Sequence, residues 1–313
     1  MTLRLSLPDE QTLERYTDLE DSGEDGVELL LWDFGGPPPA GAPIDIALRP
    51  YVLSGDLSVL DPERVRVVQT QALGYDDAIG QVPDGITWCN AVGVHEGPTA
   101  EIAMALILAS QRGIDDFARA MPSGEWTPRP MRPGLLGARV LLVGYGGIGT
   151  ELHRRLDGFG VELVRVASRA RSDEHGPVHG VAELPGLLPH ADVVVVAVPY
   201  GDATHHLVDD AFLQAMAPGA LLVNVARGKV ADTDALVRHA ADGRVRVALD
   251  VVDPEPLPAE HPLWTTSGVL VSPHVGGAVT TYADRVEALV RRQVRHLLAG
   301  EPLECVVDVS DRG

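Results

Sequence analysis

Cysteine is nearly absent from this chain: Cys89 and Cys305 are the only two in 313 residues. Two isolated cysteines have no spacing that indicates a metal site or a disulfide framework, so no metal is expected and a reducing, cytoplasmic setting fits best. The chain also lacks any run near the roughly 18 apolar residues of a membrane span, and its first residues lack the apolar core of a signal peptide. We therefore expect a soluble cytoplasmic protein with no membrane partner.

Positive charge is scarce as well. The 25 lysines and arginines face 45 aspartates and glutamates, which gives a net charge of −20, and Lys229 is the only lysine. Nucleic acids and anionic membranes bind cationic surfaces, so neither is an expected partner. An anionic small molecule would approach this protein against its mean field, and a site for one therefore needs its own arginines.

Short apolar runs divide the chain into two blocks. The length of 313 residues exceeds the usual size of one hydrophobic core, which favours two domains. In the first block, buried strands are predicted at 27–32, 45–48, 65–69 and 87–89. In the second block, strands are predicted at 139–143, 161–167, 193–197, 220–225, 245–249 and 269–271. These segments are rich in Val, Leu and Ala, as a sheet that is covered on both faces requires.

This rhythm predicts an α/β protein with two doubly wound parallel-sheet domains, a Rossmann dinucleotide-binding domain and a smaller flavodoxin-like domain. A long apolar helix is predicted over 99–118, and the prolines between Pro122 and Pro133 indicate a linker after it. A final helix over 281–298 has one apolar face and could return to pack on the first block.

A glycine-rich turn follows the strand at 139–143, and a helix-compatible segment comes next. The turn consists of Gly144, Tyr145, Gly146, Gly147, Ile148 and Gly149. A GxGxxG pattern alone is weak evidence, but between a strand and a helix it indicates a dinucleotide site. Its first glycine allows the tight turn, its second lets the backbone approach a pyrophosphate, and its third permits close helix–strand packing. The amides at the helix start then bind the phosphates.

The end of the second strand bears on the choice of cofactor. NAD-specific sites place Asp or Glu about 20 residues after the glycines, whereas this chain has Ser168, Arg169, Ala170 and Arg171 there. A serine beside arginines suits the 2′-phosphate of NADP. We therefore expect NADP to be preferred, with NAD possible. The alternative is that these arginines only offset an acidic surface.

Side chains of three kinds follow the later strands, on the edge where such sheets bind ligands. They are Arg227, Glu255 and His274. A histidine can protonate the alkoxide formed when a hydride reduces a ketone, and a neighbouring carboxylate raises its pKa. An arginine can grip a substrate carboxylate and polarise the carbonyl. Each residue alone has an ordinary explanation as a loop or surface side chain, but together behind a dinucleotide turn they indicate hydride transfer.

At these motifs the chain resembles the D-isomer-specific 2-hydroxyacid dehydrogenase family, and the match runs over most of its length. The segments that carry the resemblance are GYGGIG at 144–149, NVARGKVAD at 224–232, LDVVDPEPLP at 249–258 and SPHVGG at 272–277. The PEPLP loop and Ser168-Arg169 are most similar to the glyoxylate/hydroxypyruvate reductases of that family.

The resemblance implies residue roles. It makes Arg227 the substrate-binding arginine, His274 the acid/base and Glu255 its partner, and it places Asp250 at the nicotinamide carboxamide. Leu73 and Gly74 belong to a segment similar to the family's substrate-carboxylate loop, and would bind substrate with Arg227 and His274. The remaining cofactor contacts that it implies are Val198, Pro199, Thr204, Val225 and Ala226.

The resemblance also implies how the chain is divided and assembled. A substrate domain would comprise residues 1–95 plus 281–313, and an NAD(P)-binding domain residues 96–280, with a homodimer formed through the helix at 99–118. Two loops depart from the family. The loop after Pro199 reads YGDATHH, and Leu73 stands where smaller residues are commoner.

We thus expect an enzyme that reduces glyoxylate, hydroxypyruvate or a related 2-oxo acid with NADPH. One alternative is a dehydrogenase that oxidises a D-2-hydroxy acid such as phosphoglycerate or lactate, for which Arg49, Arg64 and Arg66 are the candidate phosphate ligands in the first block. Another is an NAD(P)-sensing binding protein similar to corepressors. The chain shows neither partner motifs nor long disordered tails, which favours an enzyme.

Overall fold

The computed structural model describes residues 2–20, 26–51, 56–126 and 131–310. The chain divides into two compact units. Met1–His95 and Thr280–Gly313 form the first unit, and Glu96–Val279 form the second. Within the described ranges, no helix is long and apolar enough to cross a membrane.

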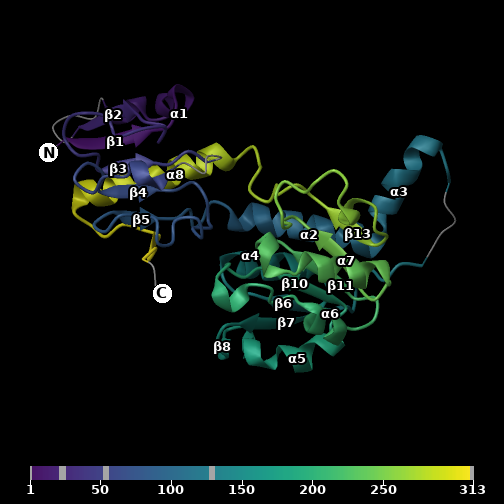
Figure 1. Cartoon of the computed structure of the whole chain (residues 1–313). Helices are drawn as coiled ribbons and strands as arrows, with labels where there is room; N and C mark the ends of the chain where they lie inside the picture. Colours follow the sequence, from purple (N-terminus) through teal and green to yellow (C-terminus); the bar gives the residue numbers. More distant parts are fainter. Residues whose placement is uncertain (1, 21–25, 52–55, 127–130, 311–313) are drawn as a thin grey trace. The chain divides into compact units, whose positions relative to one another are not determined.

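The first unit is built on one twisted sheet with the order β14-β5-β4-β3-β1-β2 (Figure 1). Its strands are β1 (Leu3–Leu7), β2 (Val27–Leu31), β3 (Ile46–Leu48), β4 (Val67–Gln69), β5 (Thr87–Cys89) and β14 (Val306–Val307). All neighbours are parallel except β14 and β5, which are antiparallel. The parallel part has the order 2-1-3-4-5, which is that of flavodoxin-like folds, so this part of the fold prediction is confirmed.

Helix α8 (Tyr282–Ala299) covers one face of that sheet and is yellow in Figure 1. Its buried residues Val286, Leu289 and Val290 pack in one apolar cluster with Leu5 and Leu48 of the sheet. The apolar stripe predicted for this last helix is therefore the face that it buries.

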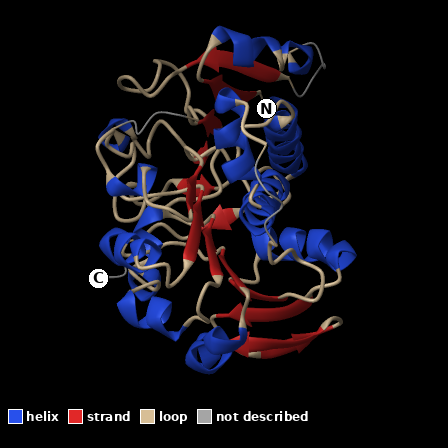
Figure 2. Ribbon diagram, turned by 90° about the vertical axis from the view of Figure 1, so that its right-hand side faces the viewer, coloured by secondary structure: helices blue, strands red, loops and turns tan. Residues whose placement is uncertain are grey.

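The second unit contains an eight-stranded sheet with the order β13-β12-β11-β10-β6-β7-β9-β8. Its strands are β6 (Arg139–Val143), β7 (Glu162–Ala167), β8 (Arg171–Asp173), β9 (Gly176–Gly180), β10 (Val193–Val196), β11 (Leu221–Asn224), β12 (Arg246–Leu249) and β13 (Val269–Val271). Apart from β8, the strand order runs outward from β6 in both directions, as in a Rossmann domain, and confirms that prediction. Helices lie on both faces of the sheet (Figure 2).

The two faces of this sheet are covered by different helices. One apolar cluster joins the sheet to α2 (Glu96–Arg112) and α4 (Gly147–Leu156), and the other joins it to α6 (Asp210–Ala215) and α7 (Thr233–Ala241). The other α-helices are α1 (Glu10–Glu14), α3 (Ile114–Ala120) and α5 (Leu184–Leu187). Short 3₁₀ turns are η1 (Thr17–Leu19), η2 (Leu57–Val59), η3 (Met121–Ser123), η4 (Asp157–Phe159), η5 (Val181–Glu183), η6 (Leu188–His190), η7 (Asp202–Thr204), η8 (Gly228–Val230) and η9 (Pro262–Trp264).

Three features differ from the sequence prediction. The helix predicted over 99–118 is wrong as one element, because Gly113 adopts φ +65° and ends α2 before α3 begins. Strand β1 was not predicted, although all five of its residues are buried. The strands β8, β9 and β14 were not predicted either. Strands β8 and β14 run antiparallel to their neighbours at sheet edges, and β9 pairs parallel with β7. Part of the predicted linker, at 127–130, lies outside the described residues.

Candidate active site

The glycine turn joins β6 to α4, and its glycines have different surroundings. A Cβ on Gly144, which has φ +106°, would lie 2.3 Å from the carbonyl oxygen of Ala197. A Cβ on Gly149 would lie 2.3 Å from the oxygen of Gly144, and one on Gly147 would meet the Glu96 side chain at 2.7 Å. A Cβ on Gly146 would have nothing within 4 Å. Packing thus requires glycine at 144 and 149, whereas at 146 glycine leaves open space at the N-cap of α4.

Side chains from the neighbouring strands brace this turn through Tyr145. The Arg165 guanidinium lies 4.7 Å from the centre of the tyrosine ring and donates to both carboxylate oxygens of Asp173. Arg171 donates to the carbonyl oxygen of Tyr145 at 3.0 Å. The tyrosine hydroxyl and Nδ1 of His153 are 2.6 Å apart, and burial lowers the pKa of that histidine. Ile148 lies in the first turn of α4.

The residues predicted to choose the cofactor lie just beyond β7. Ser168 and Arg169 are exposed. Arg171 is exposed too, but it begins β8 and is bonded to the glycine turn. Among the described residues Arg169 has no ion-pair partner, so the two arginines differ: Arg171 braces the glycine turn, whereas Arg169 is exposed and forms no ion pair there.

Two further predicted cofactor segments follow β10 and β11. Val198 and Pro199 lie at the end of β10, and the hydroxyl of Thr204 donates to the Pro199 oxygen at 2.8 Å and accepts from the Gly201 amide at 3.0 Å. The threonine therefore closes its own loop. Val225 and Ala226, directly after β11, are buried.

Arg227 follows Ala226, and the residue after it, Gly228, lies against the backbone of a neighbouring loop. A Cβ on Gly228 would be 1.8 Å from the carbonyl oxygen of Val252, so the loops after β11 and β12 touch through their backbones. Sequence reasoning passed over this glycine, because only the fold reveals the close approach. Arg227 is half-buried, and its Nη1 donates to the Ala226 oxygen at 2.8 Å.

His274 and Glu255 form a hydrogen-bonded pair. Nδ1 of His274 lies 2.8 Å from Oε2 of Glu255, whose other oxygen accepts from the Val252 amide at 2.9 Å. The hydrogen bond to Glu255 raises the pKa of His274, although burial and the charge of Arg227 oppose this. Burial works against ionisation of Glu255, but its bonds to His274 and Val252 lower its pKa, and Arg227 adds to the effect. All three predicted catalytic residues are therefore within electrostatic reach of one another.

Asp250 holds the loop that carries this histidine. Its carboxylate, on a residue only 2% exposed, accepts from the Ser272 hydroxyl at 2.6 Å and from the amides of Val275 and Gly276 at 3.0 and 2.9 Å. The His274 amide donates to the Asp250 carbonyl oxygen at 2.8 Å, and His274 itself has φ +53°. Both carboxylate oxygens are thus bonded within the chain, a positioning role that the sequence did not reveal.

Leu73 and Gly74 belong to the first unit, in the loop after β4. The Leu73 carbonyl oxygen accepts from Nδ2 of Asn90 at 2.9 Å. The hydroxyl of Thr70 accepts from the Ala72 amide at 2.9 Å. Buried polar side chains therefore fix the path of this loop.

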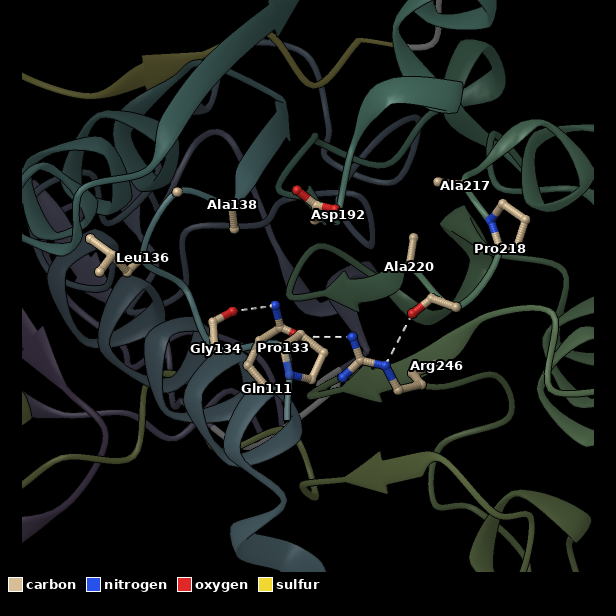
Figure 3. A pocket seen from close by; sticks show the side chains of 12 residues that line it. Gln111, Pro133, Gly134, Leu136, Ala138, Asp192, Ala217, Pro218, Ala220 and Arg246 are labelled. Carbon is tan, nitrogen blue, oxygen red and sulfur yellow. Dashed lines mark hydrogen bonds between the residues drawn. The ribbon is translucent and has the colours of Figure 1, made fainter. Parts of the chain in front are cut away.

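A cavity of about 360 Å³ lies at the opposite, amino-terminal edge of the Rossmann sheet (Figure 3). Arg246, at the start of β12, donates to Gln111 Oε1 at 2.6 Å and to the Gly219 oxygen at 3.1 Å, and burial lowers its pKa. Gln111 donates in turn to the Gly134 oxygen at 2.7 Å. These bonds tie the end of α2 to the sheet. The described residues around this cavity include none of the predicted site residues, and the described part of the chain holds no cluster of metal ligands.

Comparison with known proteins identifies the family of this chain. The family model for the NAD-binding domain of D-isomer-specific 2-hydroxyacid dehydrogenases matches residues 104–276. A glyoxylate reductase of Thermococcus onnurineus is 35% identical over 258 residues, which cover 78% of this chain and 76% of that protein. A glyoxylate reductase of Thermofilum pendens is 33% identical and covers 79% of this chain and 76% of its own length.

Solved structures have the same fold. A protein of Thermus thermophilus superposes with a TM-score of 0.76 at 27% identity, covering 98% of this chain and 100% of that one. An NADPH-dependent glyoxylate/hydroxypyruvate reductase of Sinorhizobium meliloti, in complex with NADP and malonate, superposes with a TM-score of 0.78 at 24% identity and covers 98% and 97% of the two chains.

Proposed function

The chain belongs to the D-isomer-specific 2-hydroxyacid dehydrogenase family and is an NAD(P)-dependent oxidoreductase acting on CH–OH groups, and we propose that it reduces 2-oxo acids of the glyoxylate or hydroxypyruvate type with NADPH. The observation that carries the proposal is the His274–Glu255 pair beside Arg227, at the carboxyl edge of the Rossmann sheet. The glyoxylate reductases among its relatives suggest the substrate type.

The glycine turn fits a dinucleotide. The open space at Gly146, which a Cβ would occupy, adjoins the first amides of α4, and amides at a helix start bind phosphate. In the bound state the nicotinamide ring supplies the hydride. The residues that would hold the cofactor are those of the turn, Ser168, Arg169 and Arg171, the loop of Val198, Pro199 and Thr204, and Val225, Ala226 and Asp250.

The protein's own side chains would supply the remaining steps. Arg227 binds the substrate carboxylate and polarises the adjacent carbonyl. His274 turns Nδ1 to Glu255, which leaves Nε2 to donate a proton to the carbonyl oxygen as the carbon receives hydride. Glu255 favours the charged imidazole that this donation requires. In the reverse direction the neutral imidazole accepts the proton from the hydroxy acid. For the first unit, we propose Leu73 and Gly74 as substrate-binding residues.

A substrate panel tests the reaction. Glyoxylate, hydroxypyruvate and pyruvate are offered with NADPH and with NADH, and cofactor oxidation is followed by absorbance. His274→Ala should lower kcat by about 10²- to 10⁴-fold, the usual contribution of a general acid. His190→Ala removes an exposed histidine near the other edge of the sheet and is the matched control. If both variants keep wild-type kcat, His274 is not the proton donor.

We also propose that Arg169 gives a preference for NADP. Arg169 is exposed just beyond β7, where its guanidinium can bind a 2′-phosphate, whereas Arg171 is bonded to the Tyr145 oxygen. Arg169→Ala should lower kcat/KM for NADPH about 10- to 100-fold, as expected for a lost charge-assisted hydrogen bond, and leave NADH nearly unaffected. Arg171→Ala should weaken both cofactors, because it loosens the turn itself. Wild-type protein that uses NADH better than NADPH would refute the assignment.

The proposed partner is a second copy of the chain. Around α3 the apolar side chains of Ile114, Phe117, Met121 and Trp126 are 54%, 36%, 77% and 91% exposed. Apolar side chains exposed along α3, η3 and the residues that follow them indicate a protein interface. Sedimentation should show a dimer that Met121→Asp dissociates, with Met216→Leu, at a buried position, as a control that stays dimeric. A monomeric wild-type protein at micromolar concentration contradicts this proposal.

A further inference from the structure

Arg246 is a half-buried cation on the wall of the cavity at the amino-terminal edge of the Rossmann sheet (Figure 3). Its Nε donates to the Gly219 carbonyl oxygen at 3.1 Å, its Nη1 to the Ser110 carbonyl oxygen at 3.1 Å and its Nη2 to Gln111 Oε1 at 2.6 Å. All three acceptors are uncharged. A guanidinium has more N–H groups than these three bonds use, so Arg246 keeps donors for a further acceptor.

The charge of Arg246 is not paired with a carboxylate of the described residues, whereas Arg165, for example, is paired with Asp173. Burial lowers the pKa of Arg246, and Asp115, which opposes this, is itself paired with Arg119 at 2.7 Å. A half-buried cation is costly without an anionic partner. The carbonyl end of α2 supplies roughly half a negative charge, which offsets the guanidinium only in part. An anionic group in the cavity would complete the pairing.

The cavity also presents a negative charge, from Asp192. Oδ2 of this exposed residue accepts from the Arg139 amide at 2.7 Å, and its Oδ1 has no hydrogen-bond partner among the described residues. Asp192 directly precedes β10 and Arg246 begins β12, and both of these strands pair with β11. The axes of β10 and β12 are therefore about 10 Å apart, which is two interstrand spacings. The two opposite charges lie on one cavity without pairing with each other.

Much of the remaining wall is apolar. Its carbon atoms come from Pro133, Leu136, Ala138, Ala217 and Pro218. The volume of about 360 Å³ is near the lower end of the range for small-molecule sites. The cavity therefore combines one cation, one anion and a carbon-lined space of the size that a small molecule fills.

We propose that this cavity binds an α-amino acid with an apolar side chain, with its carboxylate at Arg246 and its ammonium group at Asp192. The two charged groups of an amino acid are about 3 Å apart, and a hydrogen bond of about 3 Å at each end extends that span to about 9 Å, close to the separation of the two strands. A simple carboxylate would leave Asp192 without a partner, and a simple amine would leave Arg246 without one. The site lies at the edge of the sheet opposite to His274 and does not depend on the proposed reaction.

Calorimetry with the cofactor-free protein tests the site with leucine and two matched compounds. One is 4-methylpentanoate, which has the carbon skeleton of leucine without the ammonium group, and the other is 3-methylbutylamine, which lacks the carboxylate. We expect saturable binding of leucine and binding of each matched compound that is weaker by about tenfold or more, because each loses one charge-assisted hydrogen bond. The melting temperature of the protein should rise with leucine concentration.

Asp192→Asn is the decisive variant, because its remaining oxygen can still accept from the Arg139 amide. It should weaken leucine binding about 10- to 100-fold and leave the affinity for 4-methylpentanoate unchanged. Arg246→Gln should weaken the binding of both compounds, and urea denaturation of this variant measures how far the loss of its bonds to α2 destabilises the fold. Asp242→Asn changes an exposed acid of the same unit that does not line the cavity, and as the matched control it should keep wild-type affinity.

Arg227→Ala separates this cavity from the candidate active site, where Arg227 is the proposed carboxylate-binding residue. The affinity for leucine should be the same in this variant as in the wild type. If Arg227→Ala abolishes leucine binding and Asp192→Asn does not change it, leucine occupies the other edge of the sheet and the inference is wrong. It is also overturned by equal affinities for leucine and 4-methylpentanoate, or by no saturable leucine binding up to about 10 mM, tenfold above a weak Kd of roughly 1 mM.

Discussion

The glycine turn gives the sharpest test of the cofactor site, through the substitution Gly146→Ala. Nothing lies within 4 Å of the methyl group that this change adds. The smaller conformational freedom of the unfolded chain stabilises such a variant by about 0.4–1 kcal/mol, and the loss of glycine at a helix N-cap costs a similar amount. We therefore expect the free energy of unfolding to change by less than about 1 kcal/mol.

The cofactor should be affected far more. The methyl group occupies the space through which a pyrophosphate approaches the first amides of α4. Loss of one charge-assisted hydrogen bond at that position weakens binding about 10- to 100-fold. Titration of NADPH fluorescence gives Kd, and urea denaturation gives the stability of the same preparation. A folded Gly146→Ala protein that binds NADPH within twofold of the wild type would refute this account of the turn.

Two other glycines provide the controls. Gly158 has equally open surroundings near the far end of α4, so Gly158→Ala should raise the free energy of unfolding by about 0.4–1 kcal/mol and leave NADPH affinity unchanged. Gly144 has φ +106° and a backbone oxygen 2.3 Å from the position of a Cβ, so Gly144→Ala should destabilise the fold by about 2–5 kcal/mol. The three variants together separate the effects of ligand space, chain entropy and packing.

Three further changes probe the catalytic loops. Glu255→Gln removes the charge that raises the pKa of His274. Because reduction needs protonated His274 and fails as pH rises through that pKa, the falling limb of the kcat–pH profile should move to lower pH. A falling limb that stays at the same pH would contradict the pairing of the two residues. Gly228→Ala puts a Cβ 1.8 Å from the Val252 oxygen and should cost about 3 kcal/mol in urea denaturation and lower kcat; wild-type stability would show that the two loops do not touch. Asp250→Asn replaces one carboxylate oxygen by an NH₂ group, which cannot accept a hydrogen bond from the Val275 or Gly276 amide, so kcat and Tm should both fall. A Tm equal to that of the wild type would show that the Asp250 carboxylate does not stabilise the loop of His274.

The sequence predicted six of the eight strands of the Rossmann sheet, because most of these are nearly uninterrupted apolar runs, and it missed β8 and β9, whose residues RSD and GPVHG form no such run. It failed at β1, where Arg4 and Ser6 alternate with leucines although both are buried. Arg4 is accommodated by Glu28 on the neighbouring strand, a partner 24 residues away that no local pattern indicates. The break between α2 and α3 was missed for a similar reason: helical periodicity continues through Gly113, and only its positive φ ends the helix.

In the candidate site, too, the sequence predicted residues that belong to a motif or have a chemical use, and missed those that matter only through tertiary contacts. The glycine turn was readable because its members are contiguous, and Arg227, Glu255 and His274 because each chemical type has a use in hydride transfer. The supports of that site were not readable. Gly228 is needed only because Val252 passes it, and Asp250 holds His274 through amides of a different loop. Such contacts depend on tertiary approach, which the residue types alone do not specify.

Charge shows why those supports matter. The protein carries a net charge of −20, yet its proposed cofactor and substrate are both anions. The long-range field therefore opposes binding, and at physiological salt it is screened within roughly 8 Å. Attraction must come from cations within hydrogen-bonding distance. Most arginines cannot provide it, since partners such as Asp77 and Asp173 neutralise them. Arg169, exposed beyond β7, is the candidate for the cofactor, and Arg227, in the loop whose Gly228 touches the Val252 backbone, is the candidate for the substrate.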